Sequence, residues 1–176
     1  MSARVLMDVD EYLRTSFDGS DCEYLDGEVI ERNMGELPHG KAQGNLYYLL
    51  RNLGLGILLG LGILIVPEIR IQISPTRYRV ADLAVWLRDN IGDRIPTVPP
   101  FLAVEILSPE DRITRIQPKI AEYLSIGVEW IWLIDPIEKS AICYSQRNLA
   151  GNLTEVLRTE NPAIEIPLAE ALDINS

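Results

Sequence analysis

The stretch Phe101-Leu-Ala-Val-Glu-Ile-Leu107 decides the fold of this 176-residue chain. Apart from Glu105 it is a continuous apolar run of strand length, which predicts a central β-strand buried on both faces. Residues 78–87 predict a second core strand, and that segment also carries one acid, Asp82. An ionised carboxylate buried without a partner is costly in free energy. An acid in the middle of such a strand is therefore unusual.

Helices and further strands are predicted on both sides of this run. We expect helices over residues 9–15 (capped by Asp8), 38–53, 114–126 and 167–172, and strands over residues 23–31, 62–66, 68–73, 130–134, 141–146 and 153–157. Strands with helices between them predict the α/β class, a mixed central β-sheet flanked by helices. The length fits a single domain, 1–176, with a helix and strand at 8–36, a core at 37–146 and a C-terminal strand and tail at 147–176.

Composition excludes several classes of protein. Two cysteines and one histidine exclude a disulfide scaffold and a zinc site of the usual Cys/His type. A net charge of −10 argues against a general binder of polyanions, although ten of the acids gather in residues 1–36. Residues 1–10 carry no export signal, which predicts a cytoplasmic protein. The apolar residues 52–67 hold four glycines and are too short for a membrane helix, so no membrane partner is expected.

Two acids in neighbouring core strands suggest a metal site. Asp82 and Glu105 could share a hard divalent cation such as Mg²⁺, which prefers oxygen ligands. Each could instead form a buried ion pair with an arginine or point into a wet loop. Lys119 falls at the edge of the buried stripe of the helix after the Glu105 strand, so its ammonium could reach the same place. Two carboxylates, a lysine and a metal form a hydrolytic arrangement.

At these residues the sequence resembles the Uma-type endonucleases, a branch of the PD-(D/E)XK, or restriction-endonuclease-like, superfamily. The resemblance runs from residue 12 to about residue 144. Its landmarks are Tyr24-Leu-Asp-Gly-Glu28, His39, Ala81-Asp82, Val104-Glu-Ile-Leu-Ser-Pro109, Lys119, Tyr123 and Gly127-Val-Glu-Trp-Ile-Trp-Leu-Ile-Asp-Pro136. The resemblance implies a restriction-endonuclease-like fold and metal-dependent cleavage of nucleic acid, with DNA as the expected substrate.

The resemblance also implies roles for individual residues. Asp82, Glu105 and the backbone carbonyl of Ile106 would hold Mg²⁺ or Mn²⁺. The superfamily's lysine position, two residues after the Glu, is Leu107 here, which makes Lys119 the candidate to assist the attacking water. His39 could orient a water or touch phosphate, or it could only cap its helix.

Two departures from the family pattern support other hypotheses. Arg115 stands where family members often carry an acid, and Pro118 lies beside Lys119. A catalytically weak or inactive nucleic-acid- or protein-binding module on the same fold is therefore the alternative. A third hypothesis is an oligomer, such as a homodimer, joined through residues 55–66. The enzymatic hypothesis requires Asp82 and Glu105 to share one face of the sheet with room for a cation between them.

Overall fold

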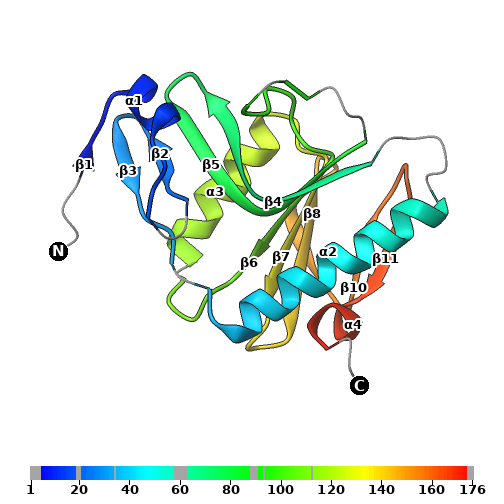
Figure 1. The fold of residues 1–176 in the computed structure, drawn as a ribbon. Coiled ribbons are helices and arrows are strands. Elements are labelled where there is room, and N and C mark those ends of the chain that lie inside the picture. The colour runs from blue at the N-terminus through cyan, green and yellow to red at the C-terminus, as the bar shows by residue number, and fades with distance from the viewer. Residues whose placement is uncertain are drawn as a thin grey trace.

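The structure, a computed structural model, describes residues 5–18, 21–33, 35–57, 63–87, 91–92, 94–111 and 113–173. Within these residues nine strands form one mixed sheet, in the order β1-β3-β2-β5-β6-β7-β8-β9, and β4 pairs with β5 beside this path (Figure 1). These strands are β1 (Val5–Leu6), β2 (Glu23–Leu25), β3 (Glu28–Ile30), β4 (Leu64–Ser74), β5 (Arg77–Trp86), β6 (Leu102–Ile106), β7 (Trp130–Asp135), β8 (Ser140–Ser145) and β9 (Asn148–Thr154). A separate pair joins β10 (Val156–Thr159) to β11 (Ile164–Pro167).

Helices cover both faces of the sheet. They are α1 (Val9–Arg14), α2 (Leu37–Ile57), α3 (Ile113–Ser125) and α4 (Leu168–Leu172). One apolar cluster joins α2, α4 and the β10–β11 pair to one face of β5, β6 and β7, and a second joins α3 to the opposite face. Figure 1 shows α2 and α3 on opposite sides of the sheet. Among the described residues no helix combines the length and apolar character that crossing a bilayer requires.

The central strands follow the sequence closely. All five residues of β6 are buried, Glu105 included, and β6 runs parallel to β7 with α3 as the crossover between them. The Asp8 carboxylate caps α1 through the backbone N–H of Asp10, as predicted. Asp26 and Gly27, both at positive φ, form the turn between β2 and β3, so residues 23–31 are a hairpin rather than one strand.

Other predicted boundaries are wrong. The two strands expected at residues 62–66 and 68–73 are one strand, β4, which pairs with β5 along most of its length. The strand expected at 153–157 is divided by a bend at Glu155, with β9 before it and β10 after it. Residues 58–62 of the glycine-rich stretch lie outside the described residues.

One edge of β5 is shared by two strands, and this arrangement opens a gap. β2 pairs with β5 at Tyr78 and Arg77, whereas β6 pairs with it from Leu83 onward. Between them the backbone of Val80 bonds to side chains: its N–H donates to Glu23 Oε1 at 3.2 Å, and its carbonyl accepts from Lys119 Nζ at 2.7 Å. Charged groups can enter the sheet there because the backbone itself supplies polar partners.

Candidate active site

Asp82 and Glu105 meet at this gap, on the face of the sheet that α3 covers. Leu83 of β5 pairs with Val104 of β6 in antiparallel register, so the next rung brings Asp82 opposite Glu105. Both are buried, with 2% and 3% of their surfaces exposed. They line a cavity of about 330 Å³ together with Lys119, His39 and Ile106. The predicted convergence of the acids on one face is therefore present, and there is space beside them.

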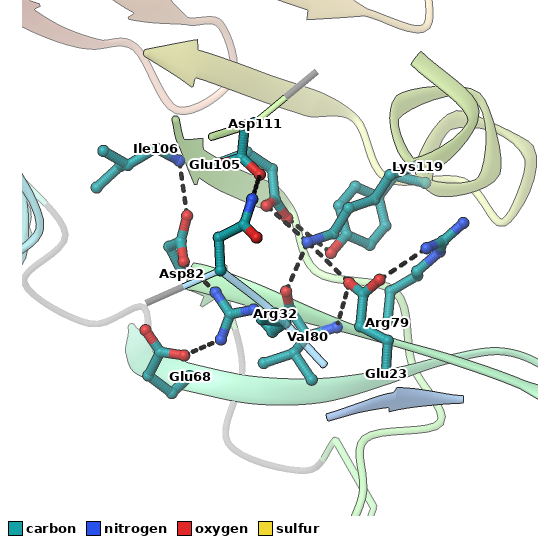
Figure 2. A network of polar contacts seen from close by, with 12 residues as sticks. Glu23, Arg32, Glu68, Arg79, Val80, Asp82, Glu105, Ile106, Asp111 and Lys119 are labelled. Atoms are coloured by element: carbon teal, nitrogen blue, oxygen red, sulfur yellow. Dashed lines mark hydrogen bonds and ion pairs between the residues drawn. The ribbon is translucent and has the colours of Figure 1, made fainter. Parts of the chain in front are cut away.

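Asp82 is held by hydrogen bonds and positive charge. Its Oδ2 accepts from the backbone N–H of Ile106 at 2.6 Å, and its Oδ1 accepts from Nη2 of Arg32 (Figure 2). Nε2 of His39 lies 3.4 Å from the same Oδ1. Burial by itself would raise the pKa of Asp82, but the His39 contact and the charges of Arg32 and Lys119 outweigh it and lower that pKa. Asp82 is therefore ionised at neutral pH.

Glu105 has a different environment. Its Oε2 accepts from Lys119 Nζ at 2.7 Å and its Oε1 from the Tyr123 hydroxyl at 2.8 Å. Complete burial and the nearby Asp82 carboxylate raise its pKa to about 7, although the charge of Lys119 opposes both effects. The two acids thus differ in proton affinity although they share one rung of the sheet.

Lys119 reaches the acids from α3, and its three N–H donors all have protein acceptors. Nζ lies 2.7 Å from the Val80 carbonyl, 2.7 Å from Glu105 Oε2 and 2.9 Å from Glu23 Oε1. Burial lowers the pKa of the ammonium, but the negative charges of Glu105 and Glu23 outweigh burial and raise it. Because an ammonium has three donors and no acceptor, Lys119 acts here as a fixed positive charge.

Glu23 links Lys119 to a chain of alternating charges. Its Oε2 accepts from Arg79 Nη1 at 2.7 Å, and Arg79 Nε donates to Glu122 Oε2 at 2.6 Å. Burial raises the pKa of Glu23, but Lys119 and Arg79 outweigh burial and lower it to about 2. Arg77 also bonds to Glu122 and continues the chain to the exposed Asp26.

Glu68 approaches the site from β4. The β4–β5 register on either side, Pro67 with Leu83 and Ile69 with Ala81, brings Glu68 opposite Asp82. Its φ of +49° is unusual for a residue with a side chain. The carboxylate accepts from Arg32 Nη1 and, at 2.8 Å, from Gln43 Nε2. Glu68, Asp82 and Glu105 thus lie in one row across three adjacent strands.

His39 occupies the beginning of α2 with 8% of its surface exposed. Burial lowers its pKa, but the contact with Asp82 and the charge of Glu68 outweigh burial and raise it. A Cβ at Gly35 would lie 2.7 Å from Nδ1 of His39, so the imidazole holds this position only because residue 35 lacks a side chain. The predicted site histidine therefore lies beside Asp82.

The two departures from the family pattern leave the acids undisturbed. Arg115 lines the cavity, but its Nη2 donates to the backbone carbonyl of Glu31 at 3.2 Å. Pro118 lies inside α3 and is exposed, and α3 continues through it to carry Lys119 inward. The structure thus brings together Asp82, Glu105, Lys119 and His39. For Ile106 it records the N–H bond to Asp82, and the role of its carbonyl stays a prediction.

Sequence reasoning missed three charged partners, Arg32, Glu23 and Glu68. Glu23 and Glu68 begin short runs of strand-forming residues, where a charged residue ordinarily marks an exposed strand end. Arg32 lies in the loop after β3. Only knowledge of which strands lie next to β5 would have identified these three residues as partners of the site. The order of residues along the chain does not show which strands are adjacent.

The donor set is chemically suited to a hard divalent cation. Carboxylate oxygens are the ligands that Mg²⁺ prefers, and one or two of them suffice when water or substrate completes the coordination. Within the described ranges no group of three or more His, Cys, Asp and Glu side chains is arranged to hold a metal. Positive charge at the acids comes from Arg32 and Lys119. A cation would therefore rest on Asp82 and Glu105.

The sheet is mixed and flanked by helices, and two acids and a lysine lie where one edge of β5 changes its partner from β2 to β6. Together these features define an α/β protein of the restriction-endonuclease-like class. A family model described as "Putative restriction endonuclease", Uma2, matches residues 9–175. The chain belongs to the Uma2 family.

A solved structure has the same fold. It is the crystal structure of a "putative nuclease belonging to DUF820" from Anabaena variabilis ATCC 29413. The two chains are 21% identical and superpose with a TM-score of 0.78, over 94% of this chain and 97% of the other. None of the curated proteins matches the chain. The family is thus one described as putative restriction endonucleases, and the fold is shared with this solved structure.

Proposed function

We propose that this protein is a metal-dependent endonuclease that hydrolyses phosphodiester bonds in DNA. The observation that carries the proposal is the buried meeting of Asp82 and Glu105 on one rung of β5 and β6, within reach of Lys119. Two buried carboxylates with a lysine at a cavity wall form an electrostatic arrangement that stability alone does not require. Membership of the Uma2 family supports the same reaction class.

The proposed cofactor is Mg²⁺ or Mn²⁺, held by Asp82, Glu105 and the backbone carbonyl of Ile106. Such an ion would polarise a phosphoryl oxygen and lower the pKa of a bound water. The chain's own residues have separate tasks. Ile106 N–H and His39 orient the Asp82 carboxylate. Lys119 keeps positive charge next to Glu105 and offsets the negative charge that develops on the phosphate as water attacks.

Plasmid nicking tests this proposal. Supercoiled DNA is incubated with the purified protein while Mn²⁺ is titrated, and Mn²⁺ binding is measured by calorimetry. We expect Asp82→Asn and Glu105→Gln each to abolish both nicking and binding, because each removes a charged oxygen ligand. Glu138→Gln, an exposed acid in the turn after β7, serves as the matched control and should match wild type. Nicking that survives both site substitutions would reject the proposed site.

A second candidate function is binding of nucleic acid without cleavage. The observation in its favour is that every carboxylate oxygen of Asp82 and Glu105 already has a protein donor. Such a module would keep its DNA affinity in Asp82→Asn and would show no nicking at any Mn²⁺ concentration. The expected homodimer also stays a prediction, and sizing chromatography at low protein concentration tests it.

A further inference from the structure

The guanidinium of Arg32 lies in the row of acids. Nη2 donates to Asp82 Oδ1 and Nη1 to Glu68 Oε2, so one planar cation joins carboxylates of two adjacent strands (Figure 2). The Arg32 side chain is only 14% exposed. Bridging of two carboxylate groups is also what a bound divalent cation does. Arg32 therefore supplies charge at Asp82, one of the two acids to which the proposed function assigns the metal.

The loop that carries Arg32 is fixed on both sides of it. The carbonyl of Glu31 accepts from Arg115 Nη2 at 3.2 Å, and Asn33 Nδ2 donates to Asp111 Oδ1 at 2.7 Å. Asp111 in turn accepts from the Ser108 backbone N–H at 2.7 Å, next to the end of β6. These contacts tie the Glu31–Asn33 loop to the segment between β6 and α3. The position of Arg32 is thus part of the fold rather than a chance orientation of a surface side chain.

We propose that Arg32 is a resident counter-ion of the site, which a divalent cation must displace from Asp82 in order to bind. The inference rests on the proposed function, because it assumes that Asp82 is a metal ligand. Guanidinium and metal compete for the same Oδ1, and their like charges repel at such short range. Arg32 therefore sets the affinity of the site for the ion: it lowers affinity while keeping buried Asp82 neutralised before the ion arrives.

Calorimetric titration of Mn²⁺ into the full-length protein, without DNA, tests the inference. Arg32→Gln removes the charge but keeps an amide that can donate to Asp82, so the fold has a partner for the buried acid. Arg32→Ala removes both. We expect Mn²⁺ to bind about tenfold more tightly to either variant than to wild type, within the usual range for coupling between two ligands. Circular dichroism establishes that each variant is folded, and Arg32→Gln covers the case in which Arg32→Ala is not.

Arg115→Ala is the matched control. It also removes an arginine that lines the cavity, but Arg115 bonds to a backbone carbonyl and not to an acid of the site. Its Mn²⁺ affinity should stay within about twofold of wild type, since Arg115 is exposed and its charge is screened by solvent. Arg32→Lys keeps the charge and should bind Mn²⁺ no more than slightly better than wild type. Tightening in Arg32→Gln without tightening in Arg115→Ala or Arg32→Lys supports the counter-ion role.

Failure of this inference is distinguishable from failure of the proposed function. If wild type binds Mn²⁺, Asp82→Asn abolishes binding, and Arg32→Gln binds equally or more weakly, then the metal site stands and the counter-ion role is overturned. If no Mn²⁺ binding that depends on Asp82 is found in wild type or Arg32→Gln, the proposed function itself fails. The counter-ion role then falls with it, because Arg32 has no ion to displace.

Discussion

Glu23, Lys119 and Arg79 show how single residues make a buried charge tolerable. Lys119 would be costly at 6% exposure if any of its three donors lacked an acceptor. Glu23 and the Val80 carbonyl take two of those donors and leave the third for Glu105. Glu23 in turn has two cations and a backbone N–H as its own donors. The charges of the candidate site therefore balance one another only when all of its members are present. Removal of one member leaves a neighbouring buried charge without its partner.

Acid titration should reveal the contribution of Glu23 to stability. Its pKa in the folded state, about 2, lies below the ordinary 4.5. Its contribution to the free energy of unfolding is therefore complete above about pH 4.5 and is lost as the pH falls towards 2. At 1.36 kcal/mol per pKa unit this contribution is up to about 3 kcal/mol. We expect Glu23→Gln to be less stable than wild type at pH 7, and the difference to shrink on acidification.

Urea denaturation at pH 7, 5 and 3.5 measures this difference. Glu160→Gln, an exposed acid on the surface, serves as the control, and its stability curve should stay parallel to that of wild type. A difference between Glu23→Gln and wild type that is the same at all three pH values would mean that the carboxylate does not titrate as the contacts with Lys119 and Arg79 require.

At the scale of elements, the β2–β3 hairpin and α2 give glycine opposite roles. Gly27 has a φ of +99° in the turn, whereas Gly44 lies within α2, and a Cβ at either position would meet no atom within 4 Å. Both positions therefore have room for a methyl side chain, and they differ only in backbone conformation. The hairpin matters for the site because it is the part of the sheet that carries Glu23 and leads into Arg32.

Alanine at these two glycines should change stability in opposite directions. Gly27→Ala should lower the free energy of unfolding by about 1 kcal/mol, because an L-residue is strained at that φ. Gly44→Ala should raise it by about 0.5–1 kcal/mol, because alanine loses less conformational entropy in a helix. Chemical denaturation of the two variants beside wild type measures both effects. The same sign for both substitutions would contradict the backbone explanation.

The elements themselves were predictable to different degrees. The buried strand β6 and the crossover helix α3 follow from apolar runs and helical spacing, which are local properties. For the β2–β3 hairpin the sequence predicts one strand over residues 23–31, since Asp26-Gly27 suits a bulge within a strand as well as a hairpin turn. Pro67 and Glu68 interrupt the pattern of β4, so the sequence predicts two strands there, yet pairing with β5 carries one strand through both residues. Long-range pairing overrides local preference there.

For the whole molecule, total charge and the charge of the site differ. The chain carries a net charge of −10, but five basic and five acidic side chains line the cavity, besides His39. The basic residues are Arg32, Arg77, Arg79, Arg115 and Lys119. Apart from Arg115, each is bonded to at least one acid, which leaves little positive charge for phosphate groups. DNA affinity from electrostatics alone should therefore be modest.

Salt dependence of DNA binding tests this balance, provided that DNA is the substrate. With nicking-deficient Glu105→Gln and a labelled duplex, we expect affinity to fall between 50 and 200 mM salt by much less than ~10³-fold, the loss for proteins with six or more phosphate contacts. Adding Arg115→Ala should reduce the slope of log affinity against log salt by about one. Fluorescence anisotropy measures both slopes. An unchanged slope would mean that Arg115 does not contact phosphate.

The sequence by itself determined the α/β class, the two core strands and the two acids within them, because burial and periodicity are properties of neighbouring residues. It also placed Lys119 at the edge of the buried stripe of its helix, since helical spacing is local as well. Only the tertiary structure decided which groups neutralise the acids. Glu23 comes from β2, Arg32 from the loop after β3, and Glu68 from β4. They reach Asp82 and Lys119 only because β5 pairs with β2, β4 and β6 at once. Charge interactions depend on distance in space, and the order of residues along the chain does not record that distance.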